Sequence, residues 1–246
     1  MKVSGFTFVR NAQVYDFPVV ESIKSMLPVC DEVYVNVGIS DDNTMDMIKS
    51  IKSDKLKIFE TEWDPKFKKK GKILAQQTNM ALYKCRGDWC IYLQADEVLH
   101  EKDCDAIRKC MEENLENERI EGLLLNYYHF FGDFEHYARS YHWYQNEIRI
   151  VRNRIGVSSW ESAQGFRIDG RKLRVKKCPA HVYHYGWVRD PYKMKNKKEY
   201  HYSLHHGNET SPYKDEERFI FEKHIDPYMI DRFKGEHPKI MQDRIK

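Results

Sequence analysis

The regular alternation of strand-like and helix-like segments through residues 3–93 constrains the fold more than any other feature of this sequence. Four short segments are rich in β-branched and other apolar residues, as buried strands are: residues 3–9, 32–37, 56–60 and 89–93. Three segments between them place apolar residues at helical spacing: residues 18–26, 42–51 and 73–85. Parallel neighbouring strands require crossover connections of this kind. The sequence therefore predicts an α/β protein with a mixed, mostly parallel sheet flanked by helices.

The rest of the chain is expected to complete that sheet. Residues 101–121 carry eight acidic and four basic residues and are predicted to form a solvated helix, whereas residues 121–128 and 146–151 are predicted strands. We expect residues 1–125 to hold a ligand beyond the carboxyl ends of the strands. Residues 126–246 are expected to form an acceptor-side half that ends in helices. Both halves are expected to belong to one compact domain.

Composition excludes several classes of protein. With 246 residues, 41% of them apolar, the chain can build a sizeable core. Its apolar runs are far shorter than the roughly 18 residues of a membrane span, and residues 1–9 are too short and mixed for a signal peptide, so we expect a cytoplasmic protein. The six cysteines show no C-x-x-C spacing, which predicts buried, reduced thiols rather than a zinc site or a disulfide framework.

The segment 89–97 carries the strongest local signal for chemistry. An apolar strand there leads directly into Gln94, Ala95, Asp96 and Glu97, which places a carboxylate at the mouth of the sheet. Mg²⁺ and Mn²⁺ take oxygen ligands and commonly bridge carboxylates to the phosphates of a substrate. The alternative is that the two acidic residues only cap the following helix.

This segment resembles family 2 glycosyltransferases, especially the subgroup similar to lipopolysaccharide-core glucosyltransferases. The resemblance covers most of residues 1–200, and the order and spacing of its parts make it specific. Its parts are Val9-Arg10-Asn11, Asp31-Glu32-Val33-Tyr34-Val35, Ser40-Asp41-Asp42-Asn43-Thr44, Glu62-Trp63, Gln77, Asn79, Ala81-Leu82, Gly87-Asp88-Trp89 and Ala95-Asp96-Glu97.

The resemblance implies a GT-A fold, a Rossmann-like arrangement that binds a nucleotide-diphospho-sugar at the carboxyl edge of the sheet. It also implies sugar transfer with inversion to a glycan or lipid-linked acceptor, as in polysaccharide biosynthesis, with Mn²⁺ or Mg²⁺ held by an Asp-x-Asp motif. The residues expected around the nucleotide sugar are Phe8, Arg10, Asn36, Lys72, Gln94, Ala95 and Asp96. Asp96 and His184 are the expected metal ligands, and Glu161 is the expected catalytic base.

The chain departs from the family pattern at two of these positions. Gln94 stands where the family has the first Asp of the metal motif; its amide can bind a ribose hydroxyl but brings no negative charge to a cation. The sequence therefore leaves the need for a metal open. Asn36 stands near the place of an acidic residue that reads the base, and it could pair with a pyrimidine edge or be an ordinary turn residue.

Glu161 follows Trp160 where the similar enzymes have a His-Glu pair. An inverting transfer needs a general base that removes the proton of the acceptor hydroxyl, and Glu161 is the candidate. The alternative is a surface glutamate in a loop. Similarly, the family match falls on His184, where a neutral imidazole could bind Mn²⁺ and a protonated one could donate to phosphate, or where the ring could be purely structural.

The basic stretch 193–198 admits three interpretations. It can be a solvated helix face, it can attract an anionic donor or a phosphorylated lipid at a membrane surface, or it can bind nucleic-acid phosphates. The formal net charge of only +3 argues against nucleic acid as a partner. Peripheral contact with the inner face of a membrane stays open, as does the oligomeric state.

Three other functions compete with sugar transfer. A catalytically inactive glycan- or nucleotide-binding protein is compatible with Gln94 and Trp160. A nucleotidyltransferase is disfavoured because residues 8–13 contain no glycine for a phosphate loop. A metal-dependent hydrolase would have to be built from the histidines that follow the basic stretch: His201, His205 and His206.

Overall fold

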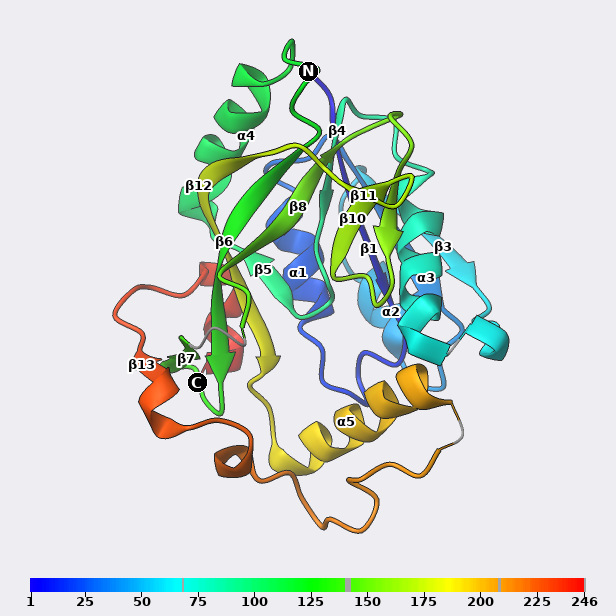
Figure 1. Cartoon of the computed structure of the whole chain (residues 1–246), viewed down its shortest axis with the longest axis vertical. Helices are drawn as coiled ribbons and strands as arrows, with labels where there is room; N and C mark the ends of the chain where they lie inside the picture. Colours follow the sequence, from blue (N-terminus) through cyan, green and yellow to red (C-terminus); the bar gives the residue numbers. More distant parts are fainter. Residues whose placement is uncertain (68, 140–142, 208, 246) are drawn as a thin grey trace.

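The central element of the fold is a mixed sheet, seen in a computed structural model that describes all residues except 68, 140–142, 208 and 246 (Figure 1). Its order is β13-β7-β6-β8-β4-β1-β2-β3, and β12 pairs with both β6 and β5. The strands are β1 Val3–Val9, β2 Glu32–Gly38, β3 Leu56–Thr61, β4 Trp89–Tyr92, β5 Glu97–Leu99, β6 Gly122–Phe131, β7 His136–Ala138, β8 Asn146–Arg152, β12 Val175–Trp187 and β13 Ile230–Arg232.

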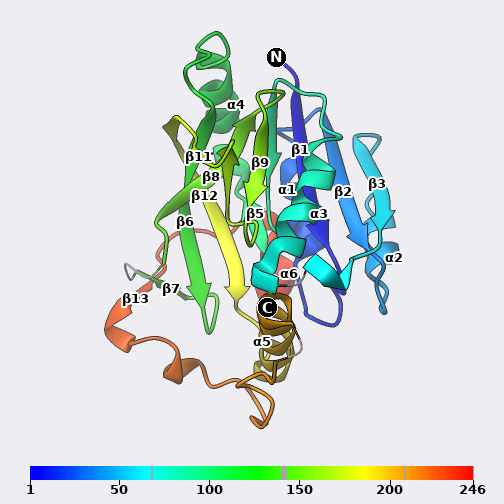
Figure 2. The same cartoon turned by 45° about the vertical axis from the view of Figure 1, so that its right-hand side comes forward.

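The helices cover this sheet on both faces, as the two views show (Figure 1, Figure 2). They are α1 Val19–Met26, α2 Thr44–Lys49, α3 Lys72–Leu82, α4 Cys104–Glu113, α5 Pro191–His206 and α6 Gln242–Ile245. A small antiparallel sheet packs beside α3 and consists of β9 Val157–Trp160, β10 Gly165–Ile168 and β11 Arg171–Lys172. Within the described part of the chain, no helix combines the length and apolar character that crossing a bilayer requires.

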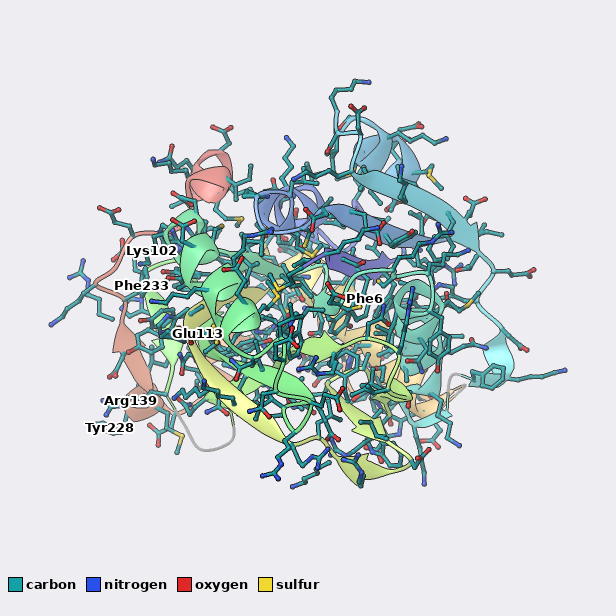
Figure 3. All side chains as sticks on the ribbon, turned by 90° about the horizontal axis from the view of Figure 1, so that it is seen from above. Phe6, Lys102, Glu113, Arg139, Tyr228 and Phe233 are labelled. Carbon is teal, nitrogen blue, oxygen red and sulfur yellow. The ribbon has the colours of Figure 1, made fainter. Side chains whose placement is uncertain are left out.

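The predicted α/β architecture is confirmed. β4, β1, β2 and β3 are mutually parallel neighbours, and β12 runs parallel to β6, whereas β8 is antiparallel to both β4 and β6. The crossover helices α1, α2 and α3 account for the parallel pairs. Buried apolar side chains fill both faces: Phe6 of β1 is fully buried, in contrast to Tyr228, which is 97% exposed at the periphery (Figure 3). All six cysteines are free, and five of them are buried, as predicted.

Two predicted helical regions differ from the structure. The helix expected over residues 101–121 ends at Glu113, because Arg152 of β8 donates hydrogen bonds to the carbonyls of Asn114, Leu115 and Asn117 and so holds the chain in an irregular path. The C-terminal residues after α5 were expected to be helical, but in their described part they contain one four-residue α-helix, three 3₁₀ turns and β13.

The start of β6 carries an ion cluster with a predictable pH dependence. Glu121 is buried and accepts hydrogen bonds from the guanidinium groups of Arg171, at 2.8 Å, and Arg174, at 2.7 Å. These bonds, above all that of Arg171, lower the pKa of Glu121 from 4.5 to about 2, although burial opposes them. A carboxyl whose pKa is lower in the folded state stabilises the fold above its unfolded pKa, and the contribution is lost as pH falls through the folded value.

Replacing Glu121 by Gln is therefore expected to lower the free energy of unfolding by about 1–2 kcal/mol at pH 7. This lies at the lower end of the range for charged hydrogen bonds, because the side chains of Arg171 and Arg174 are substantially exposed. The difference between the variant and the original protein should shrink steadily as pH falls from 4.5 towards 2. Urea denaturation at several pH values measures it. Glu118→Gln, at an exposed position nearby, serves as control and should change stability little at any pH. A difference for Glu121→Gln that stays constant with pH would contradict the assignment.

Candidate active site

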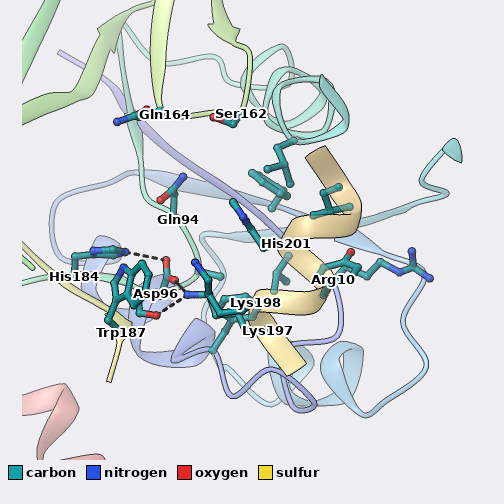
Figure 4. Close-up of a pocket in the computed structure, with 18 of the residues that line it drawn as sticks. Arg10, Gln94, Asp96, Ser162, Gln164, His184, Trp187, Lys197, Lys198 and His201 are labelled. Carbon is teal, nitrogen blue, oxygen red and sulfur yellow. Dashed lines mark hydrogen bonds and ion pairs between the residues drawn. The ribbon is translucent and has the colours of Figure 1, made fainter. Parts of the chain in front are cut away.

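A cavity of about 370 Å³ opens beyond the carboxyl ends of β1 and β4. Its floor is formed by Phe8, Val9 and Arg10 at the end of β1 and by Gln94, Ala95 and Asp96 after β4. The end of β12 and the helix α5 close it from the other side (Figure 4). The cavity thus lies at the edge of the sheet where the sequence predicted a ligand.

Helix α5 begins where the sequence dictates and presents one face to this cavity. The Asp190 carboxylate caps the helix by accepting hydrogen bonds from the backbone N–H groups of the first turn, and Pro191 occupies the first helical position. The α5 residues that line the cavity recur at intervals of three or four, as one helical face requires: Met194, Lys197, Lys198, Tyr200, His201 and Leu204. The basic stretch 193–198 is therefore partly a cavity wall rather than only a solvated surface.

The cavity carries an excess of positive charge. Arg10, Lys197 and Lys198 line it, and Asp96 is the single carboxylate among the described lining residues. Arg10 is fixed by a hydrogen bond from Nε to the carbonyl of Ile39 at 2.8 Å. A partly enclosed site with this balance attracts anions, because the surrounding protein screens charge less than water does.

Asp96 is held by an ion pair. Its carboxylate is buried, Oδ2 accepts a hydrogen bond from Lys197 Nζ at 2.9 Å, and Oδ1 lies 3.8 Å from His184 Nε2 (Figure 4). Although burial alone would raise it, the pKa of Asp96 is held well below its usual range by the positive charges of Lys197 and Arg189. Burial and the nearby Arg189 lower the pKa of Lys197 to about 8, against the opposing pull of Asp96.

The turn that presents Asp96 is fixed by a buried salt bridge beneath it. Glu97 and Arg149 of β8 are fully buried and form two parallel hydrogen bonds of 2.8 Å. The Glu97 carboxylate also accepts hydrogen bonds from the backbone N–H of Gln94 and from Tyr127 Oη. Because Glu97 binds both ends of the turn to the sheet, the neighbouring Asp96 has a fixed position at the cavity floor.

His184 is oriented by a second histidine. His129 Nε2 lies 2.8 Å from the carbonyl of Tyr144, which can only accept, so this nitrogen carries a proton. The Nδ1 atoms of His129 and His184 are 2.8 Å apart. Burial lowers the pKa of His129 to about 3 and lowers that of His184, so both rings are neutral near pH 7. His184 must then donate a hydrogen bond from Nδ1 to Nδ1 of His129. Its Nε2 atom therefore carries no proton and directs a lone pair toward Asp96.

Aromatic side chains form much of the remaining wall. Trp63 lies near Arg10, whose guanidinium carbon is 5.9 Å from the ring centroid, and Tyr200 stacks on Tyr15 at 4.5 Å. On the other side, Lys198 Nζ lies 4.4 Å from the ring centroid of Trp187. Flat aromatic faces of this kind suit the stacking of a base or the apolar face of a sugar.

Most of the predicted nucleotide-sugar residues converge on the cavity. Phe8, Arg10, Gln94, Ala95, Asp96 and His184 all line it. Lys72 does not, because it is exposed at the start of α3. Asn36 is fully buried away from the cavity, where its amide donates to Gln77 and accepts a hydrogen bond from Thr61 Oγ1.

Glu161, the predicted base, is exposed and does not line the cavity, although Ser162 and Gln164 of the same turn do. Its φ of 48° lies in the left-handed region. The lining residues that the sequence did not single out include Trp143, Tyr144 and Trp187. The surplus of aromatic residues late in the chain was a signal for such a wall, but it could not identify the members.

The residues near Asp96 do not fit a divalent cation. Asp96 is the single carboxylate among the described lining residues, and it is already paired with the ammonium group of Lys197. Gln94 contributes no charge, and His184 Nε2 lies 3.8 Å from Asp96 Oδ1. Across the residues that the structure describes, no group of three or more His, Cys, Asp or Glu side chains is arranged to hold a metal ion. The histidines considered above for a hydrolase, which belong to the described part of the chain, therefore form no such group: His201, His205 and His206.

Comparisons with known proteins found similar solved structures, all at low sequence identity. No protein-family profile and no curated protein matches the chain. Among solved structures, S. aureus TarS is similar with a TM-score of 0.49 and 16% identity over 82% of this chain and 39% of TarS. TarS 1–349 in complex with UDP-GlcNAc gives 0.49 and 14% identity, over 83% of this chain and 64% of that one.

Glucosyl-3-phosphoglycerate synthase from Mycobacterium tuberculosis, crystallised with Mn²⁺, UDP-glucose and glycerol 3-phosphate, gives a TM-score of 0.35 and 16% identity. That match covers 52% of this chain and 44% of the synthase. The chain therefore spans less than two thirds of each of these three structures. The protein is a mixed α/β protein with a mainly parallel central sheet flanked by helices, and these three structures are among those it is similar to.

Proposed function

We propose that this protein is a glycosyltransferase of the GT-A class that moves a sugar from a nucleoside-diphosphate sugar to a glycan or lipid-linked acceptor. The observation that carries the proposal is the cavity at the carboxyl ends of β1 and β4, with three basic side chains, one carboxylate and aromatic walls. A nucleoside-diphosphate sugar is an anion with two flat or partly apolar ends, and it matches such a cavity in charge and in surface. Membership of family 2 and of its lipopolysaccharide-core subgroup stays a prediction from the sequence.

The proposed reaction is an inverting displacement. The acceptor oxygen forms a bond to the anomeric carbon, the bond from that carbon to the diphosphate oxygen breaks, and its electron pair stays on the leaving diphosphate. The acceptor proton passes to a general base. In this scheme Arg10, Lys197 and Lys198 stabilise the charge that develops on the diphosphate, and Gln94 binds the donor by hydrogen bonds. Phe8 and Ala95 shape the floor of the cavity.

The proposal predicts specific binding of a nucleoside diphosphate. Isothermal titration with UDP, GDP, ADP and CDP should show one-site binding for at least one of them, and the affinity should fall at high salt because the contacts are ionic. Arg10→Met should weaken that binding about tenfold, whereas Arg139→Met, at an exposed position after β7, should change it less than twofold. Failure of every nucleoside diphosphate to bind would refute the proposal.

An inactive glycan- or nucleotide-binding protein is the second candidate, and the exposed position of Glu161 outside the cavity favours it. For sugar transfer, we propose that Glu161 reaches the acceptor when ligands bind. Glu161→Gln should then abolish release of nucleoside diphosphate from a mixture of donor and acceptor while leaving donor binding unchanged. If the original protein binds the donor but releases no nucleoside diphosphate with any glycan or lipid-linked acceptor offered, the binding function is the correct one.

A further inference from the structure

The ion pair between Asp96 and Lys197 joins two elements that lie 101 residues apart in the sequence. The side chains are only 9% and 16% exposed, and Lys197 Nζ also donates to the carbonyl of Gly186 at 2.7 Å. Gly186 belongs to β12, so the ammonium group of α5 is held at once by the turn after β4 and by the end of β12. A lysine on a helix face that only contacts solvent would not have these two fixed contacts.

The charge around Asp96 favours an anionic ligand over a cationic one. Lys197 contacts the carboxylate, and Arg189 is buried nearby, with its guanidinium donating to the carbonyl of Tyr15 at 2.7 Å. The charges of Lys197 and Arg189 therefore outweigh that of Asp96. Lys198 and Arg10 also line the cavity, and the charge of Arg10 is partly offset by Asp41, 3.6 Å away. A divalent cation entering here would be repelled, whereas a diphosphate would be attracted.

Lys197 also keeps hydrogen-bonding capacity for a ligand. An ammonium group has three N–H donors, and the contacts of Lys197 with Asp96 and Gly186 use two of them. The third can bind a phosphate oxygen without breaking the pair. The ammonium group of a lysine is a compact positive charge. Held in a fixed position, as in Lys197, it can bind one phosphate oxygen.

We propose that Lys197 links Asp96 to the diphosphate of the donor, so that this protein binds a nucleoside diphosphate without a divalent cation. This inference rests on the proposed function. In the transfer step, the electron pair of the breaking bond between the anomeric carbon and the oxygen stays on the diphosphate, and the positive charge of Lys197 offsets the added negative charge. The acceptor oxygen takes the place of that oxygen on carbon, and its proton goes to the general base.

The first test uses the unmodified protein. UDP and GDP are titrated into protein treated with EDTA and into protein with about 5 mM Mn²⁺ or Mg²⁺, enough to occupy a site of submillimolar affinity. We expect no gain in affinity with either cation; because the cations complex part of the free nucleotide, the apparent affinity should stay the same or fall. A gain of threefold or more with either cation overturns the inference but leaves the proposed function standing. Failure of both nucleotides, and of ADP and CDP, to bind under any condition refutes the proposed function and the inference with it.

The second test uses two matched variants of α5. Lys197→Met should weaken nucleoside diphosphate binding about thirtyfold in EDTA, the effect of losing one strong ionic hydrogen bond. Lys195→Met removes a lysine from the same helix that is paired with Glu199 at 3.7 Å and does not line the cavity, and it should change binding less than twofold. Equal effects of the two substitutions overturn the inference.

A folding defect in Lys197→Met is controlled by an independent measurement. The electron paramagnetic resonance signal of free Mn²⁺ is recorded with and without an excess of the unmodified protein, before any nucleotide is added. An unchanged signal is expected, because the ammonium group of Lys197 occupies the carboxylate. A stoichiometric loss of the free Mn²⁺ signal that Asp96→Asn restores overturns the inference, whether or not Lys197→Met folds.

Discussion

Replacing Glu97 by Gln is expected to lower the free energy of unfolding by about 3–5 kcal/mol, the range for breaking a buried ion pair. The substitution leaves the fully buried guanidinium of Arg149 without its partner. It also weakens the acceptor for Tyr127 Oη and for the backbone N–H of Gln94. A loss of this size is a large fraction of the total stability of a typical domain, so the variant should unfold at much lower denaturant concentration.

Chemical denaturation of Glu97→Gln and of a control variant measures this effect. Asp231→Asn removes an ion pair of similar length, at 3.0 Å to Arg139, but both partners are substantially exposed. Asp231→Asn should lower the free energy of unfolding by less than about 1 kcal/mol. The double variant Glu97→Gln/Arg149→Met should recover part of the loss, because no buried charge is left unpaired. If Glu97→Gln lowers the free energy of unfolding no more than Asp231→Asn does, the salt bridge between Glu97 and Arg149 does not stabilise the turn as described.

Replacing Gly186 by Ala is expected to weaken nucleoside diphosphate binding at least tenfold. A Cβ atom at this position would overlap His184 Nε2 and would lie 3.2 Å from Asp96 Oδ2. The ring of His184 cannot easily retreat, since its Nδ1 is bound to His129 at 2.8 Å. The ring must therefore move into the cavity or displace Asp96 from Lys197, at a cost typical of overpacking, about 1–3 kcal/mol.

Titration calorimetry with the nucleotide that binds best compares this variant with Gly165→Ala. At Gly165 the nearest atom to an added Cβ is Glu147 Oε1 at 3.3 Å, the end of a flexible side chain, so the affinity should stay within twofold. A thermal melt of Gly186→Ala separates lost binding from lost folding. Unchanged affinity in a folded Gly186→Ala protein would show that the positions of His184 and Asp96 do not matter for the ligand.

The sheet and the floor of the cavity could be predicted because the signals for them are local. The strands and helices of residues 3–93 follow from apolar spacing within short windows, and the end of β4 follows from the change from apolar to polar residues at Gln94. Parallel topology then brings Phe8, Arg10 and Asp96 to one edge. Asn36 illustrates the limit, since its side chain pairs with Gln77 and Thr61 beneath the surface, and no local pattern reveals that pairing.

The partner of Asp96 could not be predicted because it depends on long-range packing. The basic stretch indicated positive charge, but its sequence does not show which of its four lysines faces the cavity. They are Lys193, Lys195, Lys197 and Lys198. The lysines lie on different faces of α5. Lys193 pairs with Asp16 and Lys195 with Glu199, whereas the other two line the cavity. The short C-terminal elements escaped prediction for a similar reason, since 3₁₀ turns and β13 are held by contacts with distant strands.

The position of α5 concentrates a large part of the cavity wall in one contiguous segment. This 16-residue helix supplies both cationic and apolar parts of the cavity wall, while the floor comes from separate turns that also support the sheet. If the proposed function holds, substitutions at the α5 positions that line the cavity should change donor preference more than substitutions elsewhere on the helix. The same helix also packs against the rest of the protein through Met194 and Leu204, which are buried, so changes in the cavity wall have to preserve those contacts.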